Sequence, residues 1–157
     1  MSIETLISKL RKEGKLLIIE PNRDISQAYM EKAHKSLKSS RVLFKIKNLE
    51  DSIALAYYSM YFALLSVLFS VGIKSENHTI SIWLLQELFE IDNKPIKKAK
   101  KERIDKQYYV DSNVAEQEVK DMIRDAEDFV TILFNFIETL KQDDISRYRN
   151  KARKLLT

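Results

Sequence analysis

Residues 53–73 read IALAYYSMYFALLSVLFSVGI, a stretch of 21 residues without a charged side chain. Its apolar residues surround the whole circumference of a helix, and such a helix must be buried on several sides. The length alone would also suit a membrane span. Tyrosines and serines lie through its body, however, and the neighbouring segments are amphipathic. We therefore predict the central core helix of a protein that has no membrane segment.

The flanking sequence predicts further helices with short connections. The apolar spacing favours helices at residues 2–13, 24–47, 49–71, about 79–89, 113–140 and 143–156, with a part-helical connector at 94–113. The residues expected at their N-termini are Asp24, His78, Asn113 paired with Glu116, and Asp143 or Asp144. We predict an all-α, up-and-down antiparallel bundle of four or five helices. It forms one domain, with an N-terminal extension (1–22), a bundle core (24–141) and a C-terminal basic helix (143–156).

The composition excludes several classes of site. The chain has no cysteine, so thiolate metal ligands, cysteine nucleophiles and disulfides are absent. It has two histidines, His34 and His78, and no cluster at metal-ligand spacing, so we expect neither a metal nor a cofactor. Two glycines cannot build a phosphate-binding loop, and no serine lies in a triad pattern. The N-terminus does not read as a signal peptide, so we expect a cytoplasmic protein.

Four pieces of the sequence together resemble the HEPN family. These are AYYSMYFALL at 56–65, GIKSENH at 72–78, ERIDKQYY at 102–109 and the helix pattern at 115–140. Their order and spacing extend the similarity over roughly residues 25–140. The resemblance implies an up-and-down bundle, frequent dimerisation, and pairing with a minimal nucleotidyltransferase in toxin–antitoxin modules. We also expect a homodimer through the uncharged helix, because four helices cannot cover every face of it.

The chain departs from the family at its nuclease motif. Many members are metal-independent ribonucleases that place an Arg and a His on the central helix, separated by four to six residues. Such chemistry needs a base for the ribose 2′-hydroxyl and a cation for the phosphate charge. Alignment on the tyrosines puts Leu55 and Phe62 at these two positions. Nuclease activity by the usual mechanism is therefore not expected.

Aromatic and basic residues are the candidates for a binding site. Tyr57, Tyr58 and Tyr61 could stack on a base, although core packing is the favoured alternative. Arg103 with Tyr108 or Tyr109 could hold a phosphate beside a ring, or else an ion pair could tie this segment to the bundle. His78 is interpreted as a helix cap and not as a catalyst.

Two groups of cations make the charge of the chain uneven. The first group is Lys94, Lys97, Lys98, Lys100, Lys101 and Arg103, and the second is Arg147, Arg149, Lys151, Arg153 and Lys154. The rest of the chain is acidic overall, while the net charge is +4. Such asymmetry attracts a phosphate backbone or an acidic partner, and the alternative is a solvated charged face.

Three hypotheses about function follow. The first is a noncatalytic nucleotide- or RNA-binding module that partners a minimal nucleotidyltransferase in a toxin–antitoxin-type pair. The second is a toxin-type ribonuclease with an atypical site, formed by Arg103, Tyr108 and His78. The third is a structural oligomerisation module without a nucleic-acid role. The sequence leaves open the preferred nucleotide or RNA, the partner, and whether a tyrosine is modified.

Overall fold

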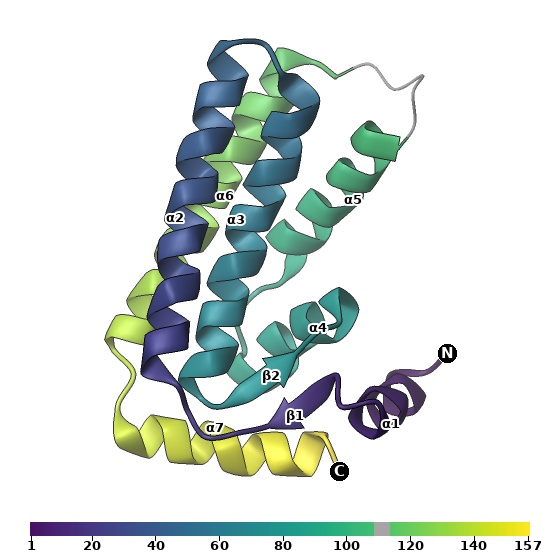
Figure 1. Cartoon of the computed structure of the whole chain (residues 1–157), viewed down its shortest axis with the longest axis vertical. Coiled ribbons are helices and arrows are strands. Elements are labelled where there is room, and N and C mark those ends of the chain that lie inside the picture. Colours follow the sequence, from purple (N-terminus) through teal and green to yellow (C-terminus); the bar gives the residue numbers. More distant parts are fainter. Residues whose placement is uncertain (109–113) are drawn as a thin grey trace.

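The computed structural model describes residues 1–108 and 114–157, apart from the side chains of residues 107 and 108. Its elements in chain order are α1 (Ile3–Lys12), β1 (Leu16–Ile18), α2 (Arg23–Lys45), α3 (Leu49–Ser70), β2 (Ile73–Ser75), α4 (His78–Phe89), α5 (Lys94–Tyr108), α6 (Glu116–Glu138) and α7 (Gln142–Leu155). Helices α2, α3 and α6 form a long bundle, with α5 along one side and α7 across one end (Figure 1). The predicted all-α bundle is confirmed.

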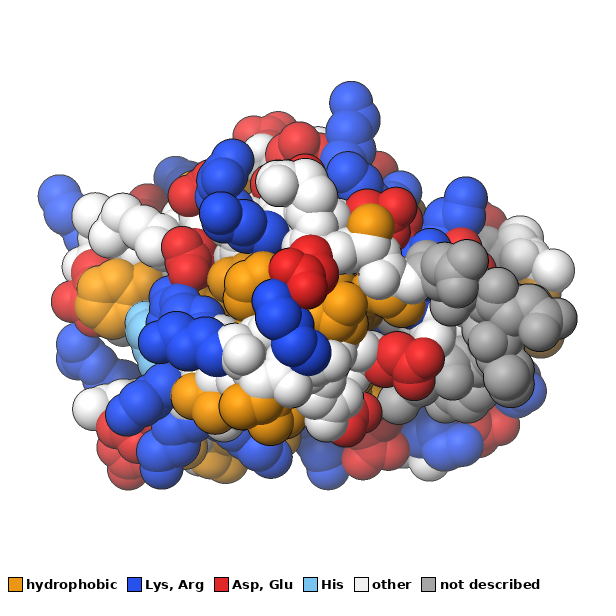
Figure 2. Space-filling model, turned by 90° about the horizontal axis from the view of Figure 1, so that it is seen from above, with side chains coloured by type: hydrophobic (Ala, Val, Ile, Leu, Met, Phe, Trp, Pro, Cys, Tyr) orange, Lys and Arg blue, Asp and Glu red, His pale blue; other side chains and the backbone are white. Residues whose placement is uncertain are grey.

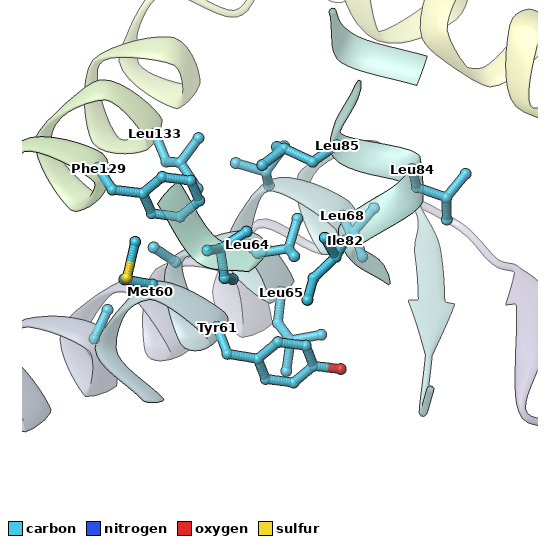
Figure 3. Close-up of a cluster of buried hydrophobic side chains, with 14 of the residues drawn as sticks. Met60, Tyr61, Leu64, Leu65, Leu68, Ile82, Leu84, Leu85, Phe129 and Leu133 are labelled. Atoms are coloured by element: carbon cyan, nitrogen blue, oxygen red, sulfur yellow. The ribbon is translucent and has the colours of Figure 1, made fainter. Parts of the chain in front are cut away.

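Helix α3 is the core of the fold, as its sequence predicts. It is long and apolar enough to cross a membrane, but 83% of its apolar 18-residue window is buried inside the protein. Met60, Leu64 and Leu68 are fully buried, and they pack with α4 and α6 (Figure 3). Helices α2, α4, α5 and α6 and strand β2 all contact α3.

The packing around α3 removes the physical reason that was given for a dimer. That argument assumed that one chain could not cover an apolar helix on all its faces. Here α5 supplies the missing cover, because Ile96 and Ala99 on its inner face are buried. The residues of α3 that stay half-exposed within its apolar run are Leu55, Tyr58, Phe62 and Ser70. A dimer is therefore not needed to bury this helix, and it stays a prediction.

Two pairs of serines join α2 to α3. Ser26 and Ser66 each donate to the backbone carbonyl of the other, at 2.7 and 2.6 Å. Ser40 and Ser52 repeat this arrangement at 2.7 and 2.8 Å. All four side chains are buried, and each bond contributes about 1 kcal/mol to stability. The small side chains let the two helices approach closely, while the exchanged bonds satisfy their hydroxyls.

A two-stranded antiparallel sheet, absent from the sequence prediction, fastens the N-terminal segment to the bundle. Leu16 pairs with Ser75, and Ile18 pairs with Ile73. The next hydrogen bond runs from the Ile19 N–H to the Gly72 carbonyl at 2.8 Å. Gly72 has a φ of +81°, a conformation that favours glycine. Figure 1 shows that the sheet and α7 lie at the same end of the bundle.

Several helix starts differ from those predicted. The cap of α2 is Asn22, whose side chain accepts from the Ile25 N–H, so the prediction of Asp24 is wrong. The backbone of Asn22 is extended, so its short side chain can reach the free N–H groups of the first helical turn. The residue that caps α6 is Ala115, and the predicted Asn113 lies outside the described residues.

Helix α7 and the connector at 94–113 differ less from their predictions. Helix α7 has Lys141 as its capping residue, and the Asp144 carboxylate accepts from the Lys141 N–H at 3.0 Å. Asp144 therefore acts from inside the first turn and not as the cap. The connector predicted as part-helical is a continuous helix from Lys94 to Tyr108.

Candidate nucleic-acid interface

A cluster of rings and cations lies where α3, α5 and the first turn of α4 meet. The Tyr57 hydroxyl of α3 lies 2.7 Å from Nδ1 of His78, the first residue of α4. The Arg103 guanidinium carbon of α5 lies 5.5 Å from the centre of the Tyr57 ring and 5.0 Å from that of Tyr58. Three elements that are distant in sequence thus converge on Tyr57.

Burial holds the inner members of this cluster in their neutral forms. Burial raises the pKa of Tyr57, and the neighbouring Tyr61 raises it further. Burial also lowers the pKa of His78, and the nearby Lys100 and Arg103 add to that effect. The hydrogen bond between Tyr57 and His78 therefore joins a phenol to a neutral imidazole, so the net charge of the cluster comes from the two cations of α5.

Arg103 is the unusual member of the cluster. Its Nε is buried without a hydrogen-bond partner, the only such side-chain atom among the described residues. Within that same part of the chain, neither Arg103 nor Lys100 forms an ion pair. The Lys100 ammonium donates to the Thr79 hydroxyl at 3.3 Å, and burial and Arg103 lower the pKa of Lys100. Two uncompensated cations on successive turns create a site that favours an anion.

The structure separates the three tyrosines that the sequence groups together. Tyr57 is fully buried, and Tyr61 is buried with its ring stacked on His78 at 3.8 Å. The Tyr61 hydroxyl lies 3.2 Å from the Ser81 hydroxyl. These two rings have no face free for a base, in keeping with the core-packing alternative. Tyr58 is half-buried and keeps part of its ring accessible.

The role expected for His78 is wrong. The side chain that caps α4 belongs to Asn77, which accepts from the Ile80 N–H at 2.9 Å. His78 is the next residue, and its ring instead contacts Tyr57 and Tyr61. The sequence gives no signal for this contact, because 21 residues separate His78 from Tyr57.

The six cations of the α5 segment divide into two sets. Lys100 and Arg103 are half-buried on the side that faces α3 and α4. The exposed set is Lys94, Lys97, Lys98 and Lys101. The predicted contact of Arg103 with Tyr108 or Tyr109 lies outside the described residues and side chains. The spacing of Ile96, Ala99, Lys100 and Arg103 places all four on one side of a helix, so it could have separated the two sets from sequence alone.

The C-terminal cations do not extend this surface. Arg149 donates to the carbonyls of Ile19 and Val71, at 2.7 and 2.8 Å, and so holds α7 on the sheet end of the bundle. Arg147 pairs with Asp144 at 3.3 Å. Helix α7 crosses the lower end of the bundle, whereas α5 lies along its side (Figure 1). Figure 2 shows the opposite end of the bundle from α7, where basic and acidic side chains are interspersed.

Two cavities of the described part of the protein are formed by residues outside the cluster. A groove of about 710 Å³ separates α2 from α6 and α7, and its floor includes Met30, Phe134 and Ile145. A smaller cavity of about 200 Å³ lies under α5. Of the predicted site residues, only Lys98 lines either one. Neither of these two cavities is lined by Tyr57, His78 or Arg103.

Comparison with protein-family models identifies the HEPN domain over residues 26–140. This span runs from the first turn of α2 to just beyond α6, and it contains every residue of the cluster. No curated protein matches the chain.

Proposed function

Since the chain belongs to the HEPN domain family, we propose that it is a noncatalytic member that binds RNA or nucleotide phosphate through Lys100 and Arg103. The family itself points to a nucleotide- or RNA-related function. The observation that carries the proposal is the buried, unpartnered Nε of Arg103 beside a second cation that has no ion pair among the described residues. Since the Nε itself is buried, a phosphate would bind the accessible part of the Arg103 side chain and supply the missing negative charge there.

The contacts of Arg103 suit recognition of phosphate. Its guanidinium lies over Tyr57 and Tyr58, so the rings limit its motion, and the half-buried side chain stays accessible in part. Guanidinium groups bind phosphate through two parallel hydrogen bonds, and an arginine that is already ordered loses less entropy on binding. The neutral His78 contributes a polar ring without a competing charge.

The noncatalytic part of the proposal rests on α3. The positions at which the family places its Arg and His hold Leu55 and Phe62, which neither transfer a proton nor carry a charge. Both are half-exposed on the same face of α3, so the usual site is accessible but lacks its chemistry.

A second function, an atypical ribonuclease, is favoured by one contact pattern. His78 and Arg103 both contact Tyr57, so two of the three residues of that hypothesis are brought together. In this reading the neutral His78 would take the proton of a ribose 2′-hydroxyl, and Arg103 would stabilise the charge on the phosphate.

A binding experiment with matched variants tests the proposed site. The affinity of the full chain for a labelled 15-nucleotide RNA would be measured against salt concentration for wild type, for Lys100→Gln/Arg103→Gln, and for the control Lys97→Gln/Lys101→Gln. Both double variants lose two charges from α5, but the control changes only exposed lysines. Each phosphate contact to a single strand contributes about 0.7 to the salt slope, so the site variant should lose about 1.4 and bind roughly 25-fold more weakly at 0.1 M salt.

Three results would overturn the proposal. Equal losses in the two variants would show that general charge, and not the cluster, binds RNA. Cleavage of the same RNA in chelator that disappears in a His78→Asn variant would establish the ribonuclease instead. If no RNA or nucleotide binds at low salt, the structural oligomerisation hypothesis replaces both.

We further propose a minimal nucleotidyltransferase as the partner, in a toxin–antitoxin-type pair, together with a homodimeric state and a cytoplasmic location. The support is the family's frequent pairing and dimerisation. A nucleotidyltransferase gene beside this one, with co-purification of the two products, is the expected observation. Sedimentation of the isolated chain as a monomer at micromolar concentration would contradict the dimer.

A further inference from the structure

A row of aromatic rings continues from the cluster along α3 and across to α2. Tyr58 lies 6.0 Å from Phe62, and Phe62 lies 6.1 Å from Tyr29 of α2, with interplanar angles of 26° and 28°. Tyr29 also stacks on Phe69 at 5.5 Å. Tyr29, Tyr58 and Phe62 are all half-exposed, whereas Phe69 is buried and supports the row from below.

Cations flank this row at two points. The Lys32 ammonium lies 4.6 Å from the centre of the Phe62 ring, and Arg103 lies over Tyr58. Lys32 is exposed, and like Arg103 it forms no ion pair within the described part of the chain. A flexible, exposed lysine can leave the ring and bind a phosphate when a base occupies its place.

We propose that Tyr29, Tyr58 and Phe62 form a stacking platform for unpaired bases, so that the ligand of this protein is single-stranded RNA. Stacked rings combined with cations that follow the backbone are the means by which proteins bind single strands without reading their sequence. The inference rests on the proposed function, because Arg103 serves both the phosphate site and the row.

The spacing of the rings decides between single and double strands. Neighbouring bases in a duplex strand lie about 3.4 Å apart, and their faces are covered by one another. The rings here are 6.0 and 6.1 Å apart, so successive bases can each use their own ring only if they unstack. A duplex offers neither free base faces nor this spacing. The positive charges over the end ring Tyr58 and over the central ring Phe62 complement a phosphate chain that crosses the row.

The test compares three forms of ligand and two kinds of variant. The full chain would be titrated with a labelled 15-nucleotide RNA, with the same strand annealed to its complement, and with AMP. Wild type should bind the single strand at least about tenfold more tightly than the duplex. Phe62→Leu and Tyr58→Leu should each weaken single-strand binding by about tenfold, with the salt slope unchanged, because a stacking contact and not a phosphate contact is lost.

Matched controls separate stacking from folding defects. Phe62→Tyr keeps a ring and should keep the affinity for single-stranded RNA. Phe134→Leu removes a ring of α6 that is 40% exposed and lies outside the row, and it should leave that affinity unchanged. Thermal unfolding of each variant shows whether it is folded at the assay temperature.

Distinct outcomes separate this inference from the proposed function. If RNA binds and depends on Arg103, but duplex binds equally well and Phe62→Leu has no effect, the platform is wrong and the phosphate site stands. If the Lys100→Gln/Arg103→Gln variant loses no more RNA affinity than its control, the proposed function itself is wrong. If Phe62→Leu instead converts a dimer into a monomer in sedimentation experiments, a second copy of the chain covers the row, and the platform is overturned.

Discussion

Lowering the pH from 7.5 to 5.5 should destabilise the wild-type protein more than a His78→Asn variant. The pKa of His78 in the folded protein lies below its ordinary value of 6.5, because the ring is partly buried and because Lys100 and Arg103 lie near it. The folded state therefore binds a proton less readily than the unfolded chain. The stability that this neutral ring contributes is complete above pH 6.5, and it is lost as the pH falls toward the pKa of the folded state.

The magnitude has an upper limit that follows from the unfolded chain. A histidine with a pKa of 6.5 is about one-tenth protonated at pH 7.5 and about nine-tenths protonated at pH 5.5. If folded His78 took up no proton in this range, linkage would cost about 1.4 kcal/mol of unfolding free energy. Solvent screening of a ring that is only half-buried reduces this value, so we expect a difference that is greater than zero and below about 1.4 kcal/mol.

Urea unfolding at both pH values, followed by circular dichroism, measures the effect. Other groups also titrate between these pH values, so the relevant quantity is the change in wild type minus the change in the variant. His78→Asn keeps a polar side chain near the Tyr57 hydroxyl while it removes the titrating group. Equal pH dependence in the two proteins would refute the reasoning, because it would mean that His78 is protonated as easily in the fold as in the unfolded chain.

Three further predictions concern stability, each measured by urea unfolding at pH 7.5. Gly72→Ala should lower the unfolding free energy by about 3 kcal/mol or more, because φ is +81° and a methyl group there would overlap the Arg149 guanidinium. A change below 1 kcal/mol would contradict this packing. Glu90→Gly should raise the unfolding free energy by about 0.5–1 kcal/mol, since Glu90 has a φ of 56° at the end of α4. A decrease in the unfolding free energy would count against this left-handed conformation. Ser66→Ala should lower it by about 1 kcal/mol through loss of its bond to the Ser26 carbonyl, and an unchanged midpoint would rule out that bond.

The sequence predicted the long helices because their signals are local. An apolar pattern on all sides specified α3, and a repeat of 3.6 residues specified α6. Both patterns need only the residues of the helix itself. The sheet was missed because its strands have three residues each, too few to show alternation, and because Leu16 pairs with Ser75 far away in the sequence. Such a short pairing is specified by the surrounding fold more than by strand propensity.

The candidate site could be predicted only in part, for a related reason. The sequence marked Arg103 and the tyrosines as candidates, but it could not show that Arg103 lies over Tyr57 and Tyr58. That contact depends on how α5 packs against α3, which the polar composition of α5 conceals. The rings of Tyr29 and Phe62 were missed as binding residues because they come from different helices and meet only in the folded protein.

The change at the family's nuclease positions also bears on how the row of rings can work. A histidine at position 62 would place a titrating group between Tyr58 and Tyr29, whereas Phe62 joins these rings into one continuous apolar surface. Leu55 likewise leaves that face of α3 without a charge of its own. The charges that a phosphate chain needs then come from neighbouring helices, Lys32 of α2 and Arg103 of α5. In the proposed noncatalytic function, Leu55 and Phe62 thus stand where the family places its proton-transfer pair, and Phe62 joins the uncharged rings on which we propose that unpaired bases stack.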